Sequence, residues 1–517
     1  MIDAVTDMRN LNLLNWMERG FALHRNWAEA DHAHEARMRA LDLEDAMRDA
    51  KPSGALGDGR LANLDDCEQA GLLNSNGLFL GAFGATGRFL FHNGEESLLT
   101  YNRAGGGKGT TLIQPALCHS RDRTLIVVDI KDGELAFSSA KHRAETLDAK
   151  VIYLNPYGLH GFPNTKINPL FRLIDVMRAG GSPDGEAESI CEIAMPAPSR
   201  PTEDWPRKSA IQLSVLRAEY LARYFPENCT LPDLWRFLNG DDEHFGMAFS
   251  MMATCGVESI ERRAQSFASM RIEAPKQWEA IRSEAATAFN AFEPGKSLGD
   301  SCAGHEFDLT RAKREKLTIY IILPANRIDV AKAWVSMLIA MMTEVIAAAR
   351  GPVRTTFIVD EFANLPRVPN ILRALRLYRG LGISYWLFSQ GRHALTSQWS
   401  REQVKDIEDQ VGIITMKSVW EPDLLKDIEL WSGTSTILQG GVSHAGGVVQ
   451  TANANLSETK RPVLQAGDVI ALGPSRQVIR VASMPHLLIS DAVPYYTVDP
   501  WRTQVRDVRD LHKGISE

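Results

Sequence analysis

Short apolar runs, rich in β-branched residues and bounded by turn residues, recur along most of the chain after Gly77. Most of them do not alternate apolar with polar residues. Such continuous runs predict strands buried on both faces, as in a mostly parallel sheet covered by helices. Helical patterns lie between them, so the chain is predicted to have an α/β fold. The predicted strands are Thr124–Ile130, Val151–Leu154, Leu317–Leu323, Thr355–Val359, Ile383–Phe388, Val411–Met416 and Gln477–Ala482, and the intervening helices include Val330–Ala349 and Asn370–Arg379.

From about Pro183 to Gly304 the strand pattern is missing. Helical patterns punctuated by proline and glycine replace it. They cover Lys208–Tyr224, Leu231–Leu238, His244–Thr254 and Ala274–Phe292. This stretch is therefore predicted to be an all-α domain inserted into the α/β domain.

Two further segments differ from the sheet pattern. Residues 1 to about 65 look helical and polar, and within them Ala33–Lys51 fits a solvated helix better than a partner-docking one. Gly433–Lys460 is small, polar and glycine-rich. We expect it to form a mobile loop.

Composition narrows the class of protein. The 517 residues predict about two to four domains. A net charge of −7 argues against a basic coat for nucleic acid but leaves room for a local basic channel. The six cysteines contain no Cys-x-x-Cys pair and the 13 histidines no His-x-x-x-His pattern. These spacings argue against a disulfide framework and a zinc site.

No segment has the pattern of a membrane span or a secretory signal. The most apolar window, Ala333–Arg350, contains Glu344 and falls short of the about 20 apolar residues that a span needs. The N-terminal segment is charged throughout, unlike a signal peptide. We therefore expect a cytoplasmic protein that reaches the inner face of a membrane only through a partner.

The strongest local motif is the glycine loop Asn102–Thr111. It follows an apolar stretch and precedes a helical one, the context of a phosphate-binding loop. Glycines at 105, 106 and 107 allow backbone N–H groups to point at phosphates, which Lys108 would neutralise. Two positions depart from the usual pattern: Asn102 replaces the first glycine, and Gly109 replaces the hydroxyl that ligates Mg²⁺. Thr110 or Thr111 could supply that hydroxyl; the alternative is a glycine-rich hairpin with an incidental lysine.

A second motif places two carboxylates, Asp360 and Glu361, directly after an apolar strand. In α/β proteins ligands bind at this edge of the sheet. Asp360 would hold Mg²⁺ and Glu361 would activate the attacking water. Gln390 ends the next strand and could sense the γ-phosphate. Arg379, between the two strands, could serve as an arginine finger, although its spacing alone favours a surface arginine.

Taken together, these motifs resemble the TraG/TraD-type coupling proteins of conjugation and type IV secretion. The resemblance covers about residues 75 to 500, and the motif order agrees. The motif at Asp360–Leu365 is highly specific, whereas the turn at Ile167–Leu170 is weak. The other similar segments are the Gly-Lys-Gly loop ending at Gly109 with Pro115 downstream, Asp129–Glu134, Asn155–Tyr157, Arg379–Gly380, Gln390, Arg461–Leu464, and Tyr495–Tyr496 before Asp499–Pro500.

The resemblance implies a RecA-like P-loop ATPase, often hexameric, that uses ATP and Mg²⁺. It implies phosphate binding by Gly105, Gly106, Gly107, Lys108, Gly109, Thr110 and Thr111, metal binding by Asp360 and Thr110, and catalysis by Lys108, Glu361, Gln390 and a trans-acting Arg379. It also implies that the helical insertion binds the cargo or its adaptor. The corresponding division is an N-terminal helical region (1–74), a nucleotide-binding domain in two parts (75–182 and 305–500), the insertion (183–304) and a C-terminal tail (501–517).

Two functions remain open at this stage. The first is a DNA-stimulated motor ATPase that moves DNA, or a relaxase–DNA complex, towards a type IV secretion channel. The second is a non-motor docking protein that binds nucleotide and recruits substrates to a membrane complex. The intact Asp360–Glu361 pair favours the motor. Asn102, Gly109 and the missing N-terminal membrane helices, which family members typically have, favour docking on a separate membrane-anchor subunit.

Basic residues in the insertion are the candidate contacts to DNA, although a solvated helix face explains them equally well. They are Arg262, Arg263, Arg271, Lys276 and Arg282.

Overall fold

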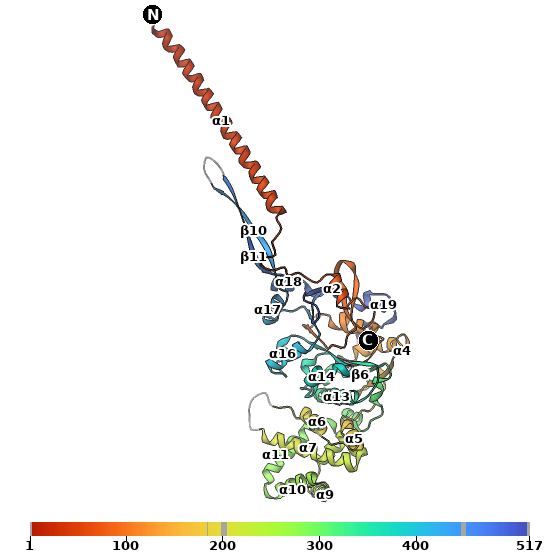
Figure 1. Ribbon diagram of the computed structural model, residues 1–517. Helices are drawn as coiled ribbons and strands as arrows, with labels where there is room; N and C mark the ends of the chain where they lie inside the picture. Colours follow the sequence, from red (N-terminus) through yellow and green to blue (C-terminus); the bar gives the residue numbers. More distant parts are fainter. Residues whose placement is uncertain (1–2, 184, 198–203, 446–450, 514–517) are drawn as a thin grey trace. The chain divides into compact units, whose positions relative to one another are not determined.

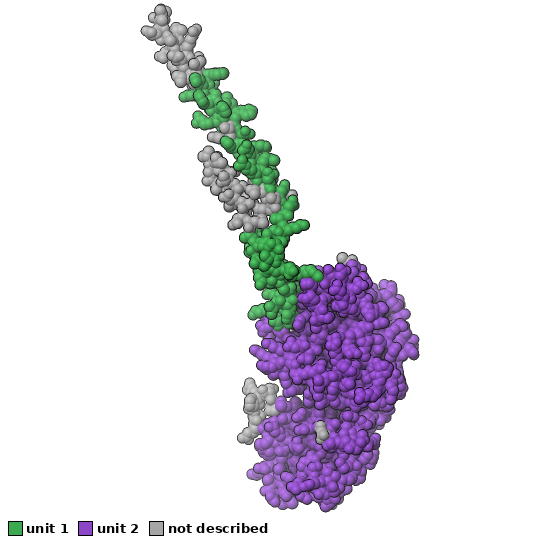
Figure 2. All heavy atoms as spheres, in the orientation of Figure 1, with its two compact units in different colours: residues 1–61, 426–465 green, residues 62–425, 466–517 purple. Residues whose placement is uncertain are grey.

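The computed structural model describes residues 3–183, 185–197, 204–445 and 451–513. The chain divides into two compact units (Figure 2). One consists of residues 1–61 and 426–465, and the other of residues 62–425 and 466–517. Each unit is described by itself.

The larger unit is built on an 11-stranded sheet in the order β2-β1-β13-β12-β9-β3-β8-β7-β4-β6-β5 (Figure 1). The strands from β9 to β5 in that order run parallel, and β12, β13, β1 and β2 extend the sheet antiparallel. The strands are β1 (Leu78–Phe83), β2 (Arg88–His92), β3 (Leu98–Asn102), β4 (Arg123–Asp129), β5 (Lys150–Leu154), β6 (Leu317–Ile322), β7 (Arg354–Val359), β8 (Ile383–Ser389), β9 (Ile413–Lys417), β12 (Arg476–Val481) and β13 (Leu488–Asp491).

All the predicted strands are present, and their apolar runs are buried as expected except in β5 at the edge of the sheet, where Val151 and Tyr153 are half-buried. Every residue of β4, β6 and β8 is buried. Leu125, Trp386 and Phe388 contribute to one core on a face of the sheet. Helices cover both faces of such strands because neither face of a parallel sheet can be left in water.

Helix α13 (Ile328–Ala348) is largely buried within the larger unit. In the described parts of the chain, the helical segment Ala325–Ala348 is the one long and apolar enough to cross a membrane. In this fold, 72% of its most apolar window is buried inside the protein. Its apolar composition therefore reflects packing in the larger unit.

The predicted helical insertion is confirmed within the same unit. Its helices are α6 (Glu186–Ala194), α7 (Trp205–Tyr224), α8 (Leu231–Leu238), α9 (Asp242–Met252), α10 (Glu258–Glu273), α11 (Pro275–Phe289) and α12 (Ser297–Cys302), and α5 (Phe171–Arg178) comes before the predicted start at about Pro183. Side chains of Thr230 and Asp241 cap α8 and α9. Edge-to-face contacts between Phe237, Phe245 and Trp278 fill the space between them.

The smaller unit corrects one prediction. Within the segment expected to be a loop, β10 (Thr434–Ala445) and β11 (Thr451–Pro462) form an antiparallel pair from Thr434↔Pro462 to Ala445↔Thr451. The glycine content of the segment concealed the β-forming Thr434, Thr436 and Ile437, whose backbone groups are satisfied by the ladder. The same unit contains α1 (Asp3–Asp49), so the predicted N-terminal helix is confirmed.

Candidate functional site

The glycine loop leaves the carboxyl end of β3 in the predicted strand–turn–helix context. Gly105 and Gly107 have φ of 75° and 77°, which other residues rarely adopt. A Cβ on Gly106 would lie 1.8 Å from Asn102 Oδ1, so a larger residue here would have to displace that side chain. After Lys108 the chain continues as a π-helical turn, η2 (Gly109–Ile113), and then as α3 (Gln114–His119). The loop backbone is thus shaped as a phosphate loop requires.

Lys108 meets both predicted carboxylates, although Glu361 is 253 positions away in the chain. Its Nζ lies 2.8 Å from Asp360 Oδ1 and also forms an ion pair with Glu361 Oε1. All three side chains are more than nine-tenths buried. Glu361 has a left-handed φ of 54°, a conformation that costs energy in a non-glycine residue and is often found at functional sites.

Lys131 is a second cation at the same carboxylates. It follows β4, and its Nζ lies 3.2 Å from Asp360 Oδ2 and 3.1 Å from Glu361 Oε1. Burial lowers the pKa of Lys131, but the two carboxylates outweigh it and raise the pKa overall. Sequence reasoning noted the Asp129–Glu134 motif and assigned Lys131 no role. Its position directly after an apolar strand was the signal available in the sequence, whereas the pairing of that strand with β7 is seen only in the structure.

Gln390 also reaches the site, where its Nε2 donates to Glu361 Oε2 over 3.2 Å. Burial acts to raise the pKa of Glu361, but Lys108, Lys131 and this amide outweigh it and lower the pKa. Glu361 is therefore ionised at neutral pH, as a base must be. Nearby, burial and the charge of Asp360 raise the pKa of Asp129 to about 8.

The loop hydroxyls point into the helix turn. Thr110 Oγ1 and Thr111 Oγ1 donate to the carbonyl of Gly107 over 3.1 Å and 2.8 Å. Thr111 also accepts a hydrogen bond of 2.9 Å from Lys417, the last residue of β9. Sequence reasoning missed Lys417, although it ends a buried strand next to β3.

Arg379 lies elsewhere. It belongs to a short 3-10 turn, η9 (Arg379–Leu381), that precedes β8, and its guanidinium pairs with Glu96 over 2.6 Å. Glu96 precedes β3. Both residues therefore sit at the amino edge of the parallel strands, while Lys108 and Gln390 sit at the carboxyl edge. Arg379 does not contribute to its own chain's pocket, and its action on another copy stays a prediction.

The residues at the carboxyl edge fit a nucleotide phosphate with Mg²⁺. Glycines in the left-handed region, a loop lysine and a following helical turn suit a polyphosphate. Carboxylate and hydroxyl oxygens are the ligands that Mg²⁺ prefers. Asp360 is placed to bind the metal ion. Thr110 could bind it only if its hydroxyl gave up the hydrogen bond to the carbonyl of Gly107.

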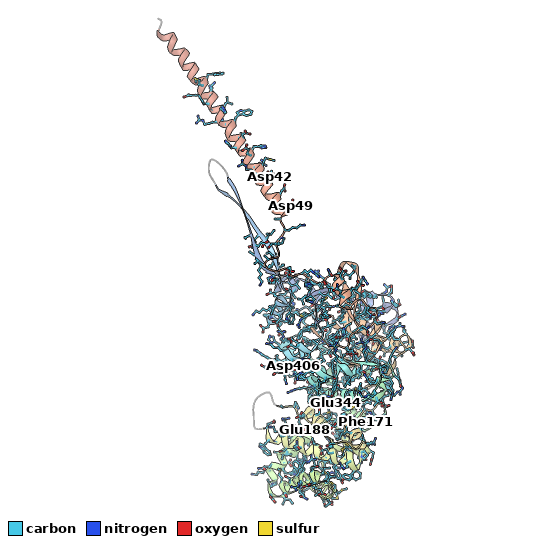
Figure 3. The ribbon with its side chains drawn as sticks, viewed as in Figure 1. Asp42, Asp49, Phe171, Glu188, Glu344 and Asp406 are labelled. Carbon is cyan, nitrogen blue, oxygen red and sulfur yellow. The ribbon has the colours of Figure 1, made fainter. Side chains whose placement is uncertain are left out.

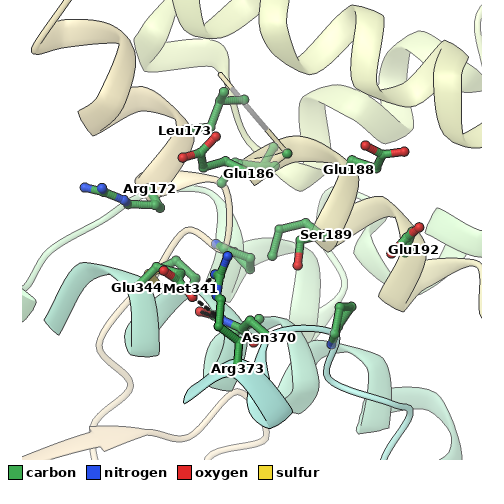
Figure 4. A pocket seen from close by; sticks show the side chains of 16 residues that line it. Arg172, Leu173, Glu186, Glu188, Ser189, Glu192, Met341, Glu344, Asn370 and Arg373 are labelled. Carbon is green, nitrogen blue, oxygen red and sulfur yellow. Dashed lines mark hydrogen bonds and ion pairs between the residues drawn. The ribbon is translucent and has the colours of Figure 1, made fainter. Parts of the chain in front are cut away.

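Two cavities lie near or beyond this site. One of about 570 Å³ opens beside the loop, with Arg103, Gln390 and Trp420 among its lining residues. The other, of about 510 Å³, lies where α5 and α6 face α13 and α14 (Ile371–Leu377). There Glu344 accepts hydrogen bonds of 2.7 Å and 2.6 Å from Asn370 and Arg373 (Figure 4). The second cavity contains none of the predicted site residues.

The basic residues of the insertion are mostly paired with acids. Arg262 pairs with Glu258 and Arg282 with Glu279, each over 2.6 Å. Arg263 and Arg271 pair with Glu219 and Asp242. This arrangement favours a solvated, charge-balanced surface over a groove for DNA.

Comparisons with known proteins agree with the fold. Residues 60–512 match the family model described as type IV secretory system conjugative DNA transfer. Two Escherichia coli proteins, both conjugal transfer protein TraG, are each 23% identical over 501 residues, covering 86% of this chain and 77% of the relative.

Solved structures of conjugative coupling proteins have a similar fold. The bacterial conjugative coupling protein TrwBdeltaN70 superposes with a TM-score of 0.61 at 14% identity, covering 84% of this chain and 92% of that one. TrwB in complex with ADP and Mg²⁺ gives 0.60 at 13% identity, covering 84% and 93%. The α/β, RecA-like fold with a helical domain is therefore confirmed.

Proposed function

The chain belongs to the type IV secretory system conjugative DNA transfer family, the TraG/TraD-type coupling proteins, and we propose that it is an ATPase of that system. In this proposal it binds ATP with Mg²⁺ at the carboxyl edge of the sheet and hydrolyses it. Hydrolysis drives DNA, or a relaxase–DNA complex, towards the secretion channel. The buried cluster of Lys108, Asp360 and Glu361 carries the proposal.

The residues divide the chemistry as follows. Backbone N–H groups of the loop bind phosphate oxygens, and Lys108 exchanges its carboxylate partners for them. Asp360 and a loop hydroxyl would hold Mg²⁺, which when bound supplies Lewis-acid stabilisation of charge on the phosphoryl oxygens. Glu361, ionised and oriented by Gln390, takes the proton of the attacking water. TrwB has been solved with ADP and Mg²⁺ and with the ATP analogue ADPNP, which supports this assignment.

Turnover measurements test the proposal. We expect phosphate release from ATP that rises when single-stranded DNA is added. Glu361→Gln should lower turnover about 100-fold or more and leave ATP binding intact, because the amide keeps the volume of the base but cannot take a proton. Arg376→Ala is a matched control, since Arg376 pairs on the surface with Asp406, which Figure 3 labels. Equal turnover in wild type and Glu361→Gln would contradict the motor.

The docking alternative draws support from a specific observation. Gly109 offers no hydroxyl, and those of Thr110 and Thr111 are engaged with Gly107. A protein of this kind would bind ATP and release almost no phosphate with or without DNA. The same turnover assay therefore separates the two functions.

The family resemblance also leads us to infer that Arg379 acts on a neighbouring copy in a ring, as arginine fingers do. Its position at the edge opposite its own pocket supports this. Mixing Arg379→Ala, which keeps the pocket, with Lys108→Ala, which keeps the arginine, should restore turnover that neither variant has alone. No recovery on mixing, or a monomeric mass with ATP present, would argue against the ring.

A further inference from the structure

Among the residues that the structure describes, two buried lysines meet the glycine loop, and only Lys108 has a counter-charge. Lys108 is balanced by Asp360 and Glu361. Lys417 is 1% exposed, and the described residues provide it with no carboxylate within ion-pair distance. A buried ammonium without a counter-ion is costly, so its retention calls for an explanation.

The fold places this ammonium directly under the loop. Lys417 ends β9 in register with Asn102, the residue from which the loop leaves β3. Its Nζ donates to Thr111 Oγ1 over 2.9 Å, and Thr111 donates to the carbonyl of Gly107 over 2.8 Å. A Cβ on Gly107 would lie 3.6 Å from this Nζ. The charge thus lies against the backbone turn that would surround a phosphate.

Glu408 and Glu421 are engaged with other partners. Glu408 accepts from the hydroxyl of Tyr101 and from Arg392. Glu421 accepts from the backbone N–H groups of Arg392 and His393. Burial alone lowers the pKa of Lys417 to about 8, with no contribution from a charged neighbour.

We propose that Lys417 is a positioning residue of the phosphate site, whose unbalanced positive charge beneath Gly107 is neutralised by the bound polyphosphate. The inference rests on the proposed nucleotide function. Lys417 acts through Thr111 and the loop backbone. Its expected contribution to ligand affinity does not depend on Mg²⁺. The competing explanation is structural: Lys417 serves only to hold Thr111.

Charge variants separate the two explanations. ADP and inorganic tripolyphosphate are titrated into the full chain by calorimetry with EDTA present, and the ligand-free melting temperature is recorded for each variant. Lys417→Met should weaken both ligands about tenfold or more, because a charge-assisted contribution is lost. Its ligand-free melting temperature should be unchanged or raised, because a buried charge is gone. Lys417→Arg, which keeps the charge, should recover most of the affinity.

Lys313 provides a matched control. It is also a buried lysine, but it donates to the carbonyl of Leu381 at the amino edge, over 2.6 Å. Lys313→Met removes a buried ammonium far from the loop and should leave both affinities unchanged.

Three results would overturn the inference. The first is wild-type affinity in Lys417→Met. The second is an equal loss of affinity in Lys417→Met and Lys417→Arg, which would assign the effect to shape. The third is a lower melting temperature with unchanged binding. If wild type itself binds neither ligand, the proposed nucleotide function fails. If wild type binds both and Lys108→Ala binds neither, the phosphate site is supported, and the three results above bear on Lys417 alone.

Discussion

The carboxyl and amino ends of the same parallel strands hold charge in different ways. At the carboxyl edge, Asp360 and Glu361 are neutralised by lysines, which are flexible point charges. At the amino edge, the carboxylate of Asp122 is neutralised by arginines. There Arg123 and Arg354 share Asp122, over 2.8 Å and 2.7 Å.

The arginines have several fixed partners each. Arg123 also donates to Thr356 over 3.3 Å, and Arg354 donates to the side chain of Asn93 over 2.8 Å. Such planar, multiply bonded groups hold strand ends together. Lysines paired only with carboxylates can exchange them for phosphate oxygens. At the carboxyl edge the lysines can therefore exchange carboxylates for a bound phosphate, whereas the ion pairs of the arginines at the amino edge stay in place and stabilise the fold.

Lys108→Ala should give the largest effect: it should remove nucleotide binding at the carboxyl edge and leave the contacts at the amino edge intact. Without its loop ammonium, the chain should lose nucleotide affinity about 100-fold or more, because charge-assisted contacts to the phosphates disappear. Calorimetric titration with ADP measures this. A melting temperature close to that of wild type would show that the loss is local to the site, whereas retained affinity would contradict the assigned role of Lys108.

Asp122→Asn should remove the ion pairs at the amino edge and lower the stability of the fold. Burial acts to raise the pKa of Asp122, but its bonds to Arg123 and the charge of Arg354 lower it, so the carboxylate stabilises the fold in its ionised form. Removing the charge leaves two guanidinium groups short of a partner. Since Asp122 and Arg354 are partly exposed, we expect a loss of about 2 kcal/mol in unfolding free energy. Denaturant titration measures it, and nucleotide affinity should not change.

Lys131→Met sharpens the comparison within the carboxyl edge. Lys131 lowers the pKa of Glu361, so its removal should raise that pKa. The acid limb of the turnover–pH profile should then move to higher pH, and turnover at neutral pH should fall about tenfold or less. An unmoved acid limb would show that Lys131 does not act on the base.

His92 tests the amino edge by pH, with the smallest expected effect. Burial, aided by Arg123, lowers the pKa of His92 from 6.5 to about 4. As the pH falls below 6.5, the unfolded chain takes up this proton before the folded one, so stability is lost between pH 6.5 and 4. Between pH 7 and 5.5 the loss should be about 1 kcal/mol. His92→Asn should flatten this part of the stability profile, and an unchanged slope would contradict the assignment.

Much of this arrangement could be predicted from the chain alone. Continuous apolar runs specified the central strands, and the spacing of glycines around Lys108 specified the loop. The carboxylates after β7 were expected at the same edge because parallel strands present their carboxyl ends together. Their contact with Lys108 shows that Lys108, Asp360 and Glu361 come together in one buried cluster, and its binding of a triphosphate stays a prediction.

Other features depended on contacts between distant segments. The hairpin of β10 and β11 needs a partner strand to satisfy its backbone, which composition does not reveal. The amino-edge location of Arg379 beside Glu96 and the inward hydroxyls of Thr110 and Thr111 are also tertiary outcomes.

The local pattern of the sequence determined which segments are strands, where the phosphate loop lies and which residues end each strand, because burial and turn formation depend on neighbouring residues. Only the tertiary structure decided the strand order that sets Lys131 beside Asp360 and Lys417 beneath Gly107. That order follows from crossover connections and packing across the whole unit, so no short window of the chain contains it.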